Sequence, residues 1–352
     1  MSEYKIPFHI QEEIVKRLPV KSLVQFRSVS KVWKSLIDGF EFIKAHSIRH
    51  HTQPQHMLVW YGDPVETVKY VCFVDDDTFP QQSYIPTLPP SVKQLNLPTV
   101  IGSSHGLVCF YGLDPEFTTK MAVIWNPWIR KSIAVPVVGE PSVGFGVCPV
   151  TCDPKIVAIT QSQDFNHCEV MVYTLSSGKW NPSNNLPTKP IRDAWSPVVT
   201  NRFIYWIAGL NLNMIMSFDV TNEKFEVMDL PDTVDTSVAM SVSISKIRES
   251  LAMLENKINS CVVWIMEDGV QRSFTKLFTI QAPVDSVVGF RKNGIPIMLV
   301  PDGDYDGPFR FVAYEPNSEH DNVLELGSSL WFNIISYIET PLLFHRSDCS
   351  SF

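Results

Sequence analysis

One structural unit recurs along this 352-residue chain from about residue 57 onward. Each unit consists of an apolar strand, a variable loop, a second strand, a tight polar turn and a third strand that ends near a proline. Successive units step by 52, 49, 45, 46 and 49 residues, counted from Val74 through Asn126, Leu175, Val220, Met266 and Glu315. A period in the forties built from strands alone is typical of propeller blades. The sequence therefore predicts an all-β domain over residues 57–342, in the form of a six-bladed β-propeller.

The strand before each variable loop is almost wholly apolar, which predicts burial on both of its faces. The clearest examples are residues 107–110, 156–159, 203–207, 251–254 and 295–300. Blades packed between neighbouring blades supply that burial, whereas a two-sheet sandwich accommodates six such units poorly. Closing the ring requires a strand from the far end of the chain, and residues 334–338 are the candidate to complete the first blade.

The segment before the repeat is predicted to form short helices. One helix face is apolar, made by Ile10, Ile14, Val15 and Leu18. Pro7 suits the first turn of this helix and Pro19 cannot continue it. Ser22 with Gln25 has capping-box spacing for a second helix, and Ser30 can cap a third. Such a small unit rarely stands alone, so its surplus apolar surface either packs on the rest of the chain or docks a partner.

The order of residues in this segment resembles the F-box, especially its plant form. The resemblance rests on residues 18–23, Leu-Pro-Val-Lys-Ser-Leu, and on residues 29–33, Val-Ser-Lys-Val-Trp, and it extends over residues 1–47. It departs from the family pattern at Ile6 and at Phe8-His9. It implies a module of three to four short helices that docks a Skp-type adaptor and, through it, the cullin and RING subunits of a ubiquitin ligase. The adaptor-binding residues implied are Pro7, Ile10, Ile14, Leu18, Pro19, Leu23, Val29, Trp33 and Leu36.

The repeat region resembles the plant F-box-associated domain. The matching motifs are residues 102–109, Trp125-Asn126-Pro127, Gly144-Phe145-Gly146 and Tyr337-Ile338-Glu339-Thr340. Some proteins of this group are termed kelch-like, but the paired glycines of kelch blades are missing here. The resemblance implies a substrate-recognition domain over residues 57–342, which a linker over 48–56 would join to the F-box. Residues 343–352 would then be a tail.

Charge is spread unevenly over a chain whose net charge is −8. Residues 1–50 hold nine Lys and Arg against five Asp and Glu, and the remainder holds 20 against 32. A basic module on an acidic body suggests an acidic partner for the module, and it argues against nucleic acid because no basic stripe is present. No apolar run approaches the length of a membrane span. The seven cysteines are interpreted as reduced thiols of an intracellular protein, and we expect it in the nucleus or the cytoplasm.

Metal and catalytic motifs are weak in this sequence. The residues Cys148, Cys152, His167 and Cys168 do not have the spacing of a known zinc finger and are expected to include buried thiols. The acidic run Asp302, Asp304 and Asp306 lacks the glutamate of a calcium loop, because Ala313 stands at the twelfth position. Ser103-Ser104-His105 is interpreted as a turn between strands. We therefore expect no metal and no cofactor.

In each of the six units, the connection between the two inner strands has its own length and chemistry. Propeller geometry places all six connections on one rim. They are residues 62–67, 111–120, 162–167, 209–213, 255–260 and 301–308. Binding residues concentrate on loops held by a rigid scaffold. The substrate-binding candidates are Tyr61, Asp63, Tyr111, Asp114, Phe117, Phe165, Asp304 and Tyr305. Aromatic residues ringed by acidic groups suit a basic protein partner.

Three functions remain open at this point. The leading one is a non-catalytic substrate receptor of a Skp–cullin–F-box ubiquitin ligase. A propeller enzyme of the glycosidase or lactonase type is disfavoured, because the expected channel-lining strands, such as 143–148, 196–200 and 236–244, offer Ser, Thr and Val in place of carboxylates. An F-box scaffold that works outside the ligase is the third.

Overall fold

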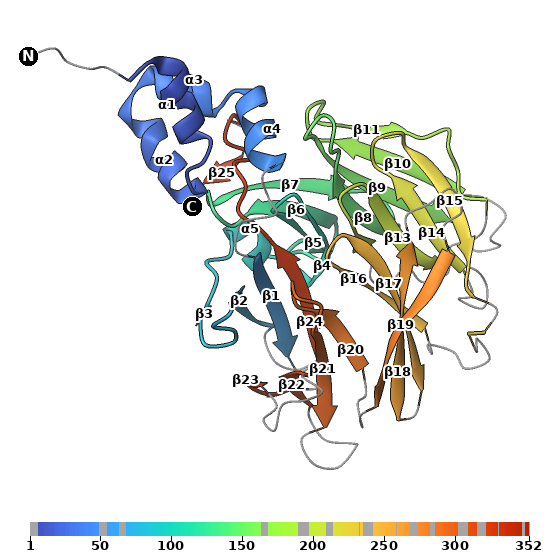
Figure 1. The fold of residues 1–352 in the computed structure, drawn as a ribbon. Coiled ribbons are helices and arrows are strands. Elements are labelled where there is room, and N and C mark those ends of the chain that lie inside the picture. The colour runs from blue at the N-terminus through green and yellow to red at the C-terminus, as the bar shows by residue number, and fades with distance from the viewer. Residues whose placement is uncertain are drawn as a thin grey trace, which may run out of the picture.

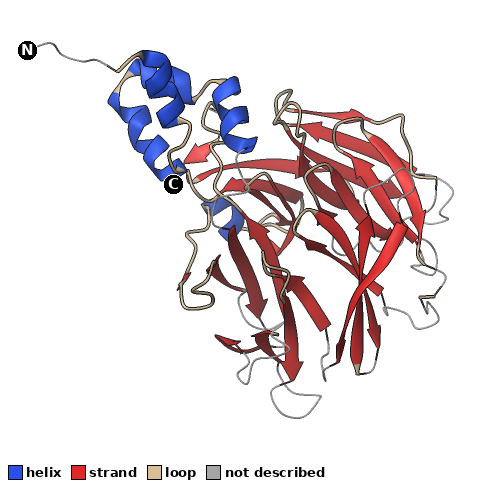
Figure 2. Ribbon diagram, in the orientation of Figure 1, coloured by secondary structure: helices blue, strands red, loops and turns tan. Residues whose placement is uncertain are grey.

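Four short helices lie at one end of the molecule and a ring of six β-sheets forms the rest (Figure 1). The computed structural model describes residues 6–48, 55–62, 68–162, 168–188, 197–208, 214–231, 233–234, 242–257, 259–267, 273–281, 286–301, 309–314, 322–329, 331–346 and 349–351. Colouring by secondary structure separates an all-α end from an all-β body, apart from the short α5 (Pro90–Lys93) (Figure 2). None of the described helices is long and apolar enough to cross a membrane.

The helical unit consists of α1 (Phe8–Val15), α2 (Val20–Val29), α3 (Lys31–Ile37) and α4 (Phe40–Ile48). Ser30 caps α3 as predicted, since its side chain accepts a hydrogen bond from the Trp33 amide at 3.2 Å. The predicted capping box at Ser22 and Gln25 is wrong, because α2 already begins directly after Pro19. The fixed φ of Pro19 starts this helix without a side-chain cap.

Each of the six sheets has four strands from the channel outward, and one carries a fifth strand at its outer edge. The four strands follow sequence order in five sheets, whereas the sixth has the last long strand of the chain innermost. Blade 1 contains β24 (Trp331–Tyr337), β1 (Gln55–Gly62), β2 (Lys69–Asp75) and β3 (Ser83–Tyr84). Blade 2 contains β4 (Asn96–Ser104), β5 (Leu107–Leu113), β6 (Lys120–Asn126), β7 (Lys131–Val137) and the added β25 (Ser350–Ser351). Blade 3 contains β8 (Ser142–Val147), β9 (Pro154–Gln161), β10 (Cys168–Thr174) and β11 (Lys179–Pro182).

The remaining three blades repeat this order. Blade 4 contains β12 (Val198–Val199), β13 (Phe203–Ala208), β14 (Met214–Asp219) and β15 (Lys224–Asp229). Blade 5 contains β16 (Val242–Ile247), β17 (Ser250–Lys257), β18 (Ser260–Glu267) and β19 (Ser273–Gln281). Blade 6 contains β20 (Ser286–Phe290), β21 (Pro296–Pro301), β22 (Phe309–Ala313) and β23 (Asn322–Ser329). The six-bladed propeller predicted from the repeat is confirmed.

The C-terminal strand closes the ring, as the sequence predicts. β24 pairs with β1 in antiparallel register from His56 opposite Tyr337 to Gly62 opposite Trp331. One sheet thus joins residues that are nearly 300 positions apart, so blade 1 contains the first and the last long strand of the propeller. This closure removes the open edge that a six-unit repeat would otherwise leave at each end.

The apolar middle strands pack between neighbouring blades, which explains why they lack alternation. Trp206 of β13 and Phe218 of β14 are fully buried in one such layer, together with Val157 and Val172 of the preceding blade. Gly144 on β8 allows this approach, because a Cβ there would lie 2.5 Å from the Trp206 ring. Strands that are buried on both faces need apolar residues at every position.

The topology separates two rims. We number the strands of each blade from the channel outward. The six variable connections join the second and third strands, and all of them open on the same rim. The turns between first and second strands, and between third and fourth strands, open on the opposite rim, which faces the helices. The innermost strand expected at 236–244 is β16, which the structure places at Val242–Ile247; residues 235–241 lie outside the described part.

Described residues of the segment expected to be a tail, 343–352, pack against the rest of the molecule. Leu342, Leu343 and Phe344 are at most 3% exposed, and β25 pairs with β7 through Ser350 and Ser132. Phe344 enters the core of the helical unit, which explains why this segment lies between the helices and the propeller (Figure 1). We call residues 339–346 the C-terminal strap. The expected linker is also shorter, because Gln55 and His56 already belong to β1.

Candidate functional site

Exposed apolar side chains concentrate on the helical unit. Half of the large hydrophobic residues that are exposed in the described part of the chain lie within residues 6–40: Ile6, Phe8, Ile10, Ile14, Val24, Val29, Val32 and Phe40. Ile10 and Ile14 lie one turn apart on α1, and the Phe8 ring lies 5.9 Å from the ring of Trp33 on α3. A unit this small that exposes so much apolar surface fits a docking module.

The residues implied to bind the adaptor fall into three groups. Pro7, Ile10, Ile14, Pro19 and Val29 are exposed, whereas Leu18, Trp33 and Leu36 are half-buried. Leu23 is fully buried and packs in the core of the helical unit, so it supports the surface from beneath. The sequence did not single out Phe8, Val24 or Val32, which are exposed beside these residues along α1, α2 and α3. The role of this surface stays a prediction.

The C-terminal strap holds the helical unit on the propeller. The Glu339 carboxylate accepts a hydrogen bond from the Val20 amide at the start of α2, at 2.9 Å. Arg27 forms an ion pair with Asp38 and donates to the Phe344 carbonyl oxygen at 3.1 Å, while its guanidinium lies 4.5 Å from the Phe344 ring centre. Burial raises the pKa of Glu339. These contacts fix one orientation between the two parts of the molecule.

Two side chains of blade 2 fasten the strap: Lys131 donates to the carbonyl oxygens of Leu343, Phe344 and Arg346, and Asn126 holds the residues before them. The Asn126 side chain is fully buried and donates to the carbonyl oxygens of Thr340 and Leu342 at 2.9 and 2.8 Å. Its oxygen accepts from the Trp128 and Ile129 amides at 3.0 and 3.3 Å. One side chain therefore satisfies four backbone groups, two on the strap and two on the turn that packs under the helices.

The predicted substrate residues are only partly brought together. Tyr61 and Tyr111 lie in β1 and β5 and not in loops; Tyr61 stacks on Phe332 at 5.3 Å, and burial raises the pKa of Tyr111 to about 12. Sequence patterning missed this because both strands extend further than their apolar runs. Four other candidates, Asp63, Phe165, Asp304 and Tyr305, lie outside the described residues.

The connection between β5 and β6 is the described loop that fits a recognition role. Asp114 organises it, because its carboxylate accepts hydrogen bonds from the Thr118 amide at 2.7 Å and the Thr118 hydroxyl at 2.9 Å. Phe117 at its tip is 62% exposed and has a left-handed backbone with φ of 57°. An ordered turn that displays an aromatic ring is suited to contacting another protein.

Two cavities meet inside the propeller channel. One, of about 580 Å³, opens toward the helical unit, and another, of about 650 Å³, opens toward the rim of variable loops. Ser103, Lys246 and Ser336 line both, so they mark the place where the two cavities approach each other. Among the described residues that line the larger cavity, none is an Asp, Glu, His or Cys.

Comparison with known families accounts for both parts of the chain. The F-box domain family matches residues 4–45, and the F-box associated beta propeller domain family matches residues 70–302. This chain is an F-box protein of the F-box-associated propeller family. The first match covers α1 to α3 and the first part of α4, and the second covers more than half of the chain, from β2 to β21.

Similar F-box proteins come from Arabidopsis thaliana. F-box protein At2g21930 is 27% identical over 78% of this chain and 72% of its own length. F-box/kelch-repeat protein At3g23880 is 26% identical over 81% of this chain and 82% of its own length. F-box protein CPR1 is 28% identical over 79% and 73%, respectively. The associated-domain assignment made from the glycine pattern thus agrees with the family that matches the propeller.

The motif residues of the F-box-associated domain have structural roles in this propeller. His105 and Gly106 form a tight turn between β4 and β5, with φ of 49° and 81°. The turn expected for Ser103-Ser104-His105 is thus confirmed for His105, whereas Ser103 and Ser104 belong to β4. A Cβ on Gly106 would lie 2.5 Å from the Ile338 carbonyl oxygen and 2.7 Å from Thr340 Cγ2, so only glycine lets the start of the strap pass here. Asn126 and Glu339, described above, belong to the other motifs and hold the F-box in place.

We expect Asn126→Ala to destabilise the F-box protein by roughly 3 kcal/mol, because it leaves several buried backbone groups without partners. Loss of the strap contacts should also speed proteolysis between the F-box and the propeller. Thermal melting and limited trypsin digestion measure both effects. Asn181→Ala, at an exposed position on β11, is the control. Unchanged melting of Asn126→Ala would show that the strap is held by other contacts.

The metal motifs considered in the sequence do not form a site in the described structure. Across the described residues, no group of three or more His, Cys, Asp or Glu is placed to hold a metal ion. Cys148 and Cys152 share a turn, in which the Cys152 amide donates to the Cys148 carbonyl oxygen at 2.8 Å. His167 and the run 302–307 lie outside the described residues. All seven cysteines are free thiols.

A buried histidine makes stability depend on pH. Burial lowers the pKa of His56 to about 4, although Asp76 opposes this shift. In the unfolded chain the pKa returns to about 6.5, so the unfolded state binds more protons between these values. The contribution of His56 to the free energy of unfolding is therefore fully present above pH 6.5 and is lost as the pH falls toward 4. At pH 5 the expected loss from His56 is about 2 kcal/mol.

The matched variant is His56→Phe, which keeps the ring against Trp128, 4.8 Å away, and removes the titration. Urea unfolding at pH 7, 6 and 5 should show a shallower loss of stability for this variant than for the wild type. His9→Phe, at an exposed position on α1, is the control. Equal pH profiles for His56→Phe and the wild type would contradict this account.

Proposed function

We propose that this F-box protein is the substrate-recognition subunit of a Skp–cullin–F-box ubiquitin ligase in the nucleus or cytoplasm. The observation that carries the proposal is the match of residues 4–45 to the F-box family, on helices that expose Ile10, Ile14 and Val29. The helices and the rim of variable loops lie on opposite sides of the propeller. This arrangement leaves the loops accessible when an adaptor covers the helices.

The protein to be ubiquitinated binds the rim of variable loops. Support comes from the ordered loop that displays Phe117 and from the charge of residues 51–352, which hold 20 Lys and Arg against 32 Asp and Glu. Opposite charges attract partners and select among them. We therefore propose a basic protein as the substrate.

The two alternatives have less support. A propeller enzyme commonly uses carboxylates or His and Cys ligands in the channel, and the larger cavity has no Asp, Glu, His or Cys among its described lining residues. An F-box scaffold outside the ligase shares the same surface, so only a functional test separates it from a receptor. The test is reconstitution of the chain with a Skp-type adaptor, cullin and RING subunit. A stable complex that ubiquitinates a captured protein supports the receptor; an adaptor complex that recruits no cullin supports the scaffold.

Replacing residues 114–119 with a Gly-Ser linker is expected to abolish substrate capture and leave adaptor binding intact. The structure narrows the replacement to these six residues, because 111–113 and Lys120 belong to strands. Captured proteins are compared by affinity purification and mass spectrometry with cullin neddylation blocked. The control replaces Ser176-Ser177 with Gly-Gly in a tight turn on the opposite rim. Unaltered capture and ubiquitination by the 114–119 variant would show that this loop is a tolerated surface insertion.

A further inference from the structure

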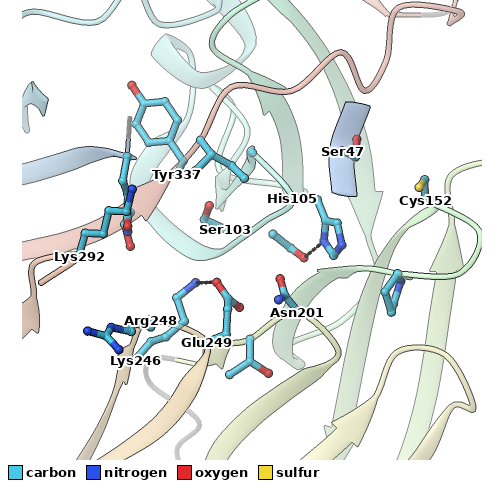
Figure 3. A pocket seen from close by; sticks show the side chains of 17 residues that line it. Ser47, Ser103, His105, Cys152, Asn201, Lys246, Arg248, Glu249, Lys292 and Tyr337 are labelled. Atoms are coloured by element: carbon cyan, nitrogen blue, oxygen red, sulfur yellow. Dashed lines mark hydrogen bonds and ion pairs between the residues drawn. The ribbon is translucent and has the colours of Figure 1, made fainter. Parts of the chain in front are cut away.

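The cavity that faces the F-box has the dimensions of a small-molecule site. Its volume is about 580 Å³, inside the range in which proteins hold drug-sized ligands. It is bounded by turns between first and second strands and by Ser47 of α4 (Figure 3). The F-box therefore forms one wall, and the propeller channel forms the rest.

The wall of this cavity is cationic although the propeller is acidic. Lys246 and Arg248 come from the β16–β17 hairpin and Lys292 from the turn after β20, and all three border the same space (Figure 3). Glu249 is the one acidic residue among the described lining residues, and its carboxylate lies 3.6 Å from the Lys246 ammonium. The cavity thus keeps an excess of positive charge, and a concave wall concentrates the resulting field.

A neutral donor completes this wall. The Ser47 hydroxyl is buried, only 2% exposed as a residue, and has no hydrogen-bond partner in the described structure. Leaving a buried hydroxyl unpaired costs free energy, which a ligand oxygen would recover once the Ser47 side chain turns into the cavity. Lysine, arginine and serine all present donors here, so the cavity matches a ligand whose surface consists mainly of acceptor oxygens.

We propose that this cavity binds a small organic polyphosphate, a polyol or nucleoside that carries two or more phosphate groups. Its three cations come from two blades and Ser47 of the F-box lines the same cavity, whose volume of about 580 Å³ one phosphate ion would fill only in part. The ligand would bridge the F-box and the propeller. The proposal depends on neither the adaptor nor the substrate.

The test uses the full chain at physiological ionic strength, with sodium tripolyphosphate as the probe and orthophosphate as the comparison. Isothermal titration should show saturable binding of tripolyphosphate and much weaker binding of orthophosphate, with a rise in melting temperature. Arg248→Gln with Lys292→Gln changes two exposed positions and should weaken binding by about tenfold or more. Ser47→Ala should weaken it a few-fold.

The matched control is Lys179→Gln with Lys224→Gln, which removes the same charge from exposed positions on β11 and β15. Unchanged binding by this control supports a defined site. Equal losses in both double variants would mean diffuse attraction of a polyanion and would overturn the proposal. Absence of saturable binding to the folded wild type would overturn it as well, and equal affinity for orthophosphate would exclude the polyphosphate class.

Discussion

Ending the chain after Ser329 is expected to unfold the propeller. This truncation removes β24, so β1 loses its ladder with β24 from His56 to Gly62 and keeps only its pairing with β2. The channel loses one of its six inner strands. It also uncovers Met57 and Val59, which are fully buried. Each buried aliphatic side chain contributes about 1.5–3 kcal/mol, so a whole strand outweighs the usual stability of about 5–15 kcal/mol. Circular dichroism and thermal melting should show no cooperative transition.

Ending the chain after Pro341 is the matched control. It keeps β24 and all six blades but removes Leu342, Leu343 and Phe344 from beneath the F-box. The propeller should then melt cooperatively, and the F-box should melt separately at lower temperature. Residues 53–345, without the F-box, should also fold because they retain every blade. If the chain ending at Ser329 melted like the full chain, closure by β24 would not be needed for stability.

Ile14→Glu with Val29→Glu is expected to abolish binding to a Skp-type adaptor. The two side chains are 48% and 69% exposed, so the exchange leaves the core of the F-box intact. Apolar interface anchors contribute about 2 kcal/mol or more each, and the pair should cost at least about a hundredfold in affinity. A glutamate would also repel an acidic partner, which the basic charge of residues 1–50 suggests.

Co-purification and titration with the purified adaptor measure this loss, and melting shows that the variant is folded. Val138→Glu with Leu277→Glu is the control, because these propeller residues are 88% and 49% exposed. This surface pair tests docking more cleanly than Leu18→Ala with Trp33→Ala, which would also lower the stability of the F-box. Full adaptor binding by the folded glutamate pair would rule out this face as the docking surface.

Sequence patterning predicted the propeller because its signal is local and repeated. The apolar strands and tight turns recur at a regular period, and residues 334–338 stood out as one strand left over for closure. Sequence patterning predicted less well which side chains of the helices are buried. Periodicity placed Ile10, Ile14 and Val15 on one apolar stripe, yet Val15 is buried and the other two are exposed. A pattern gives the stripe, but the neighbours decide which part of it is covered.

The features that sequence reasoning missed depend on contacts between distant segments. Leu342-Leu343-Phe344 is too short to show a period, and its partners, Arg27 and Trp128, lie more than 200 residues away. The cavity cations behave similarly, because Arg248 and Lys292 become neighbours only when blades 5 and 6 pack side by side. The one sign of the strap in the sequence was this apolar run, which closely follows Tyr337-Ile338-Glu339-Thr340, a motif that resembles the F-box-associated domain.

The closure of the ring by β24 also sets an order on synthesis. The first propeller strand, β1, cannot complete its pairing until β24 leaves the ribosome, 269 to 281 residues later. The F-box, at the other end of the chain, takes Phe344 into its core and is completed later still. A ribosome-bound chain therefore has neither a closed channel nor a finished docking module. Under the proposed function, adaptor recruitment follows translation of Phe344, and products that end before this residue would present an incomplete docking surface.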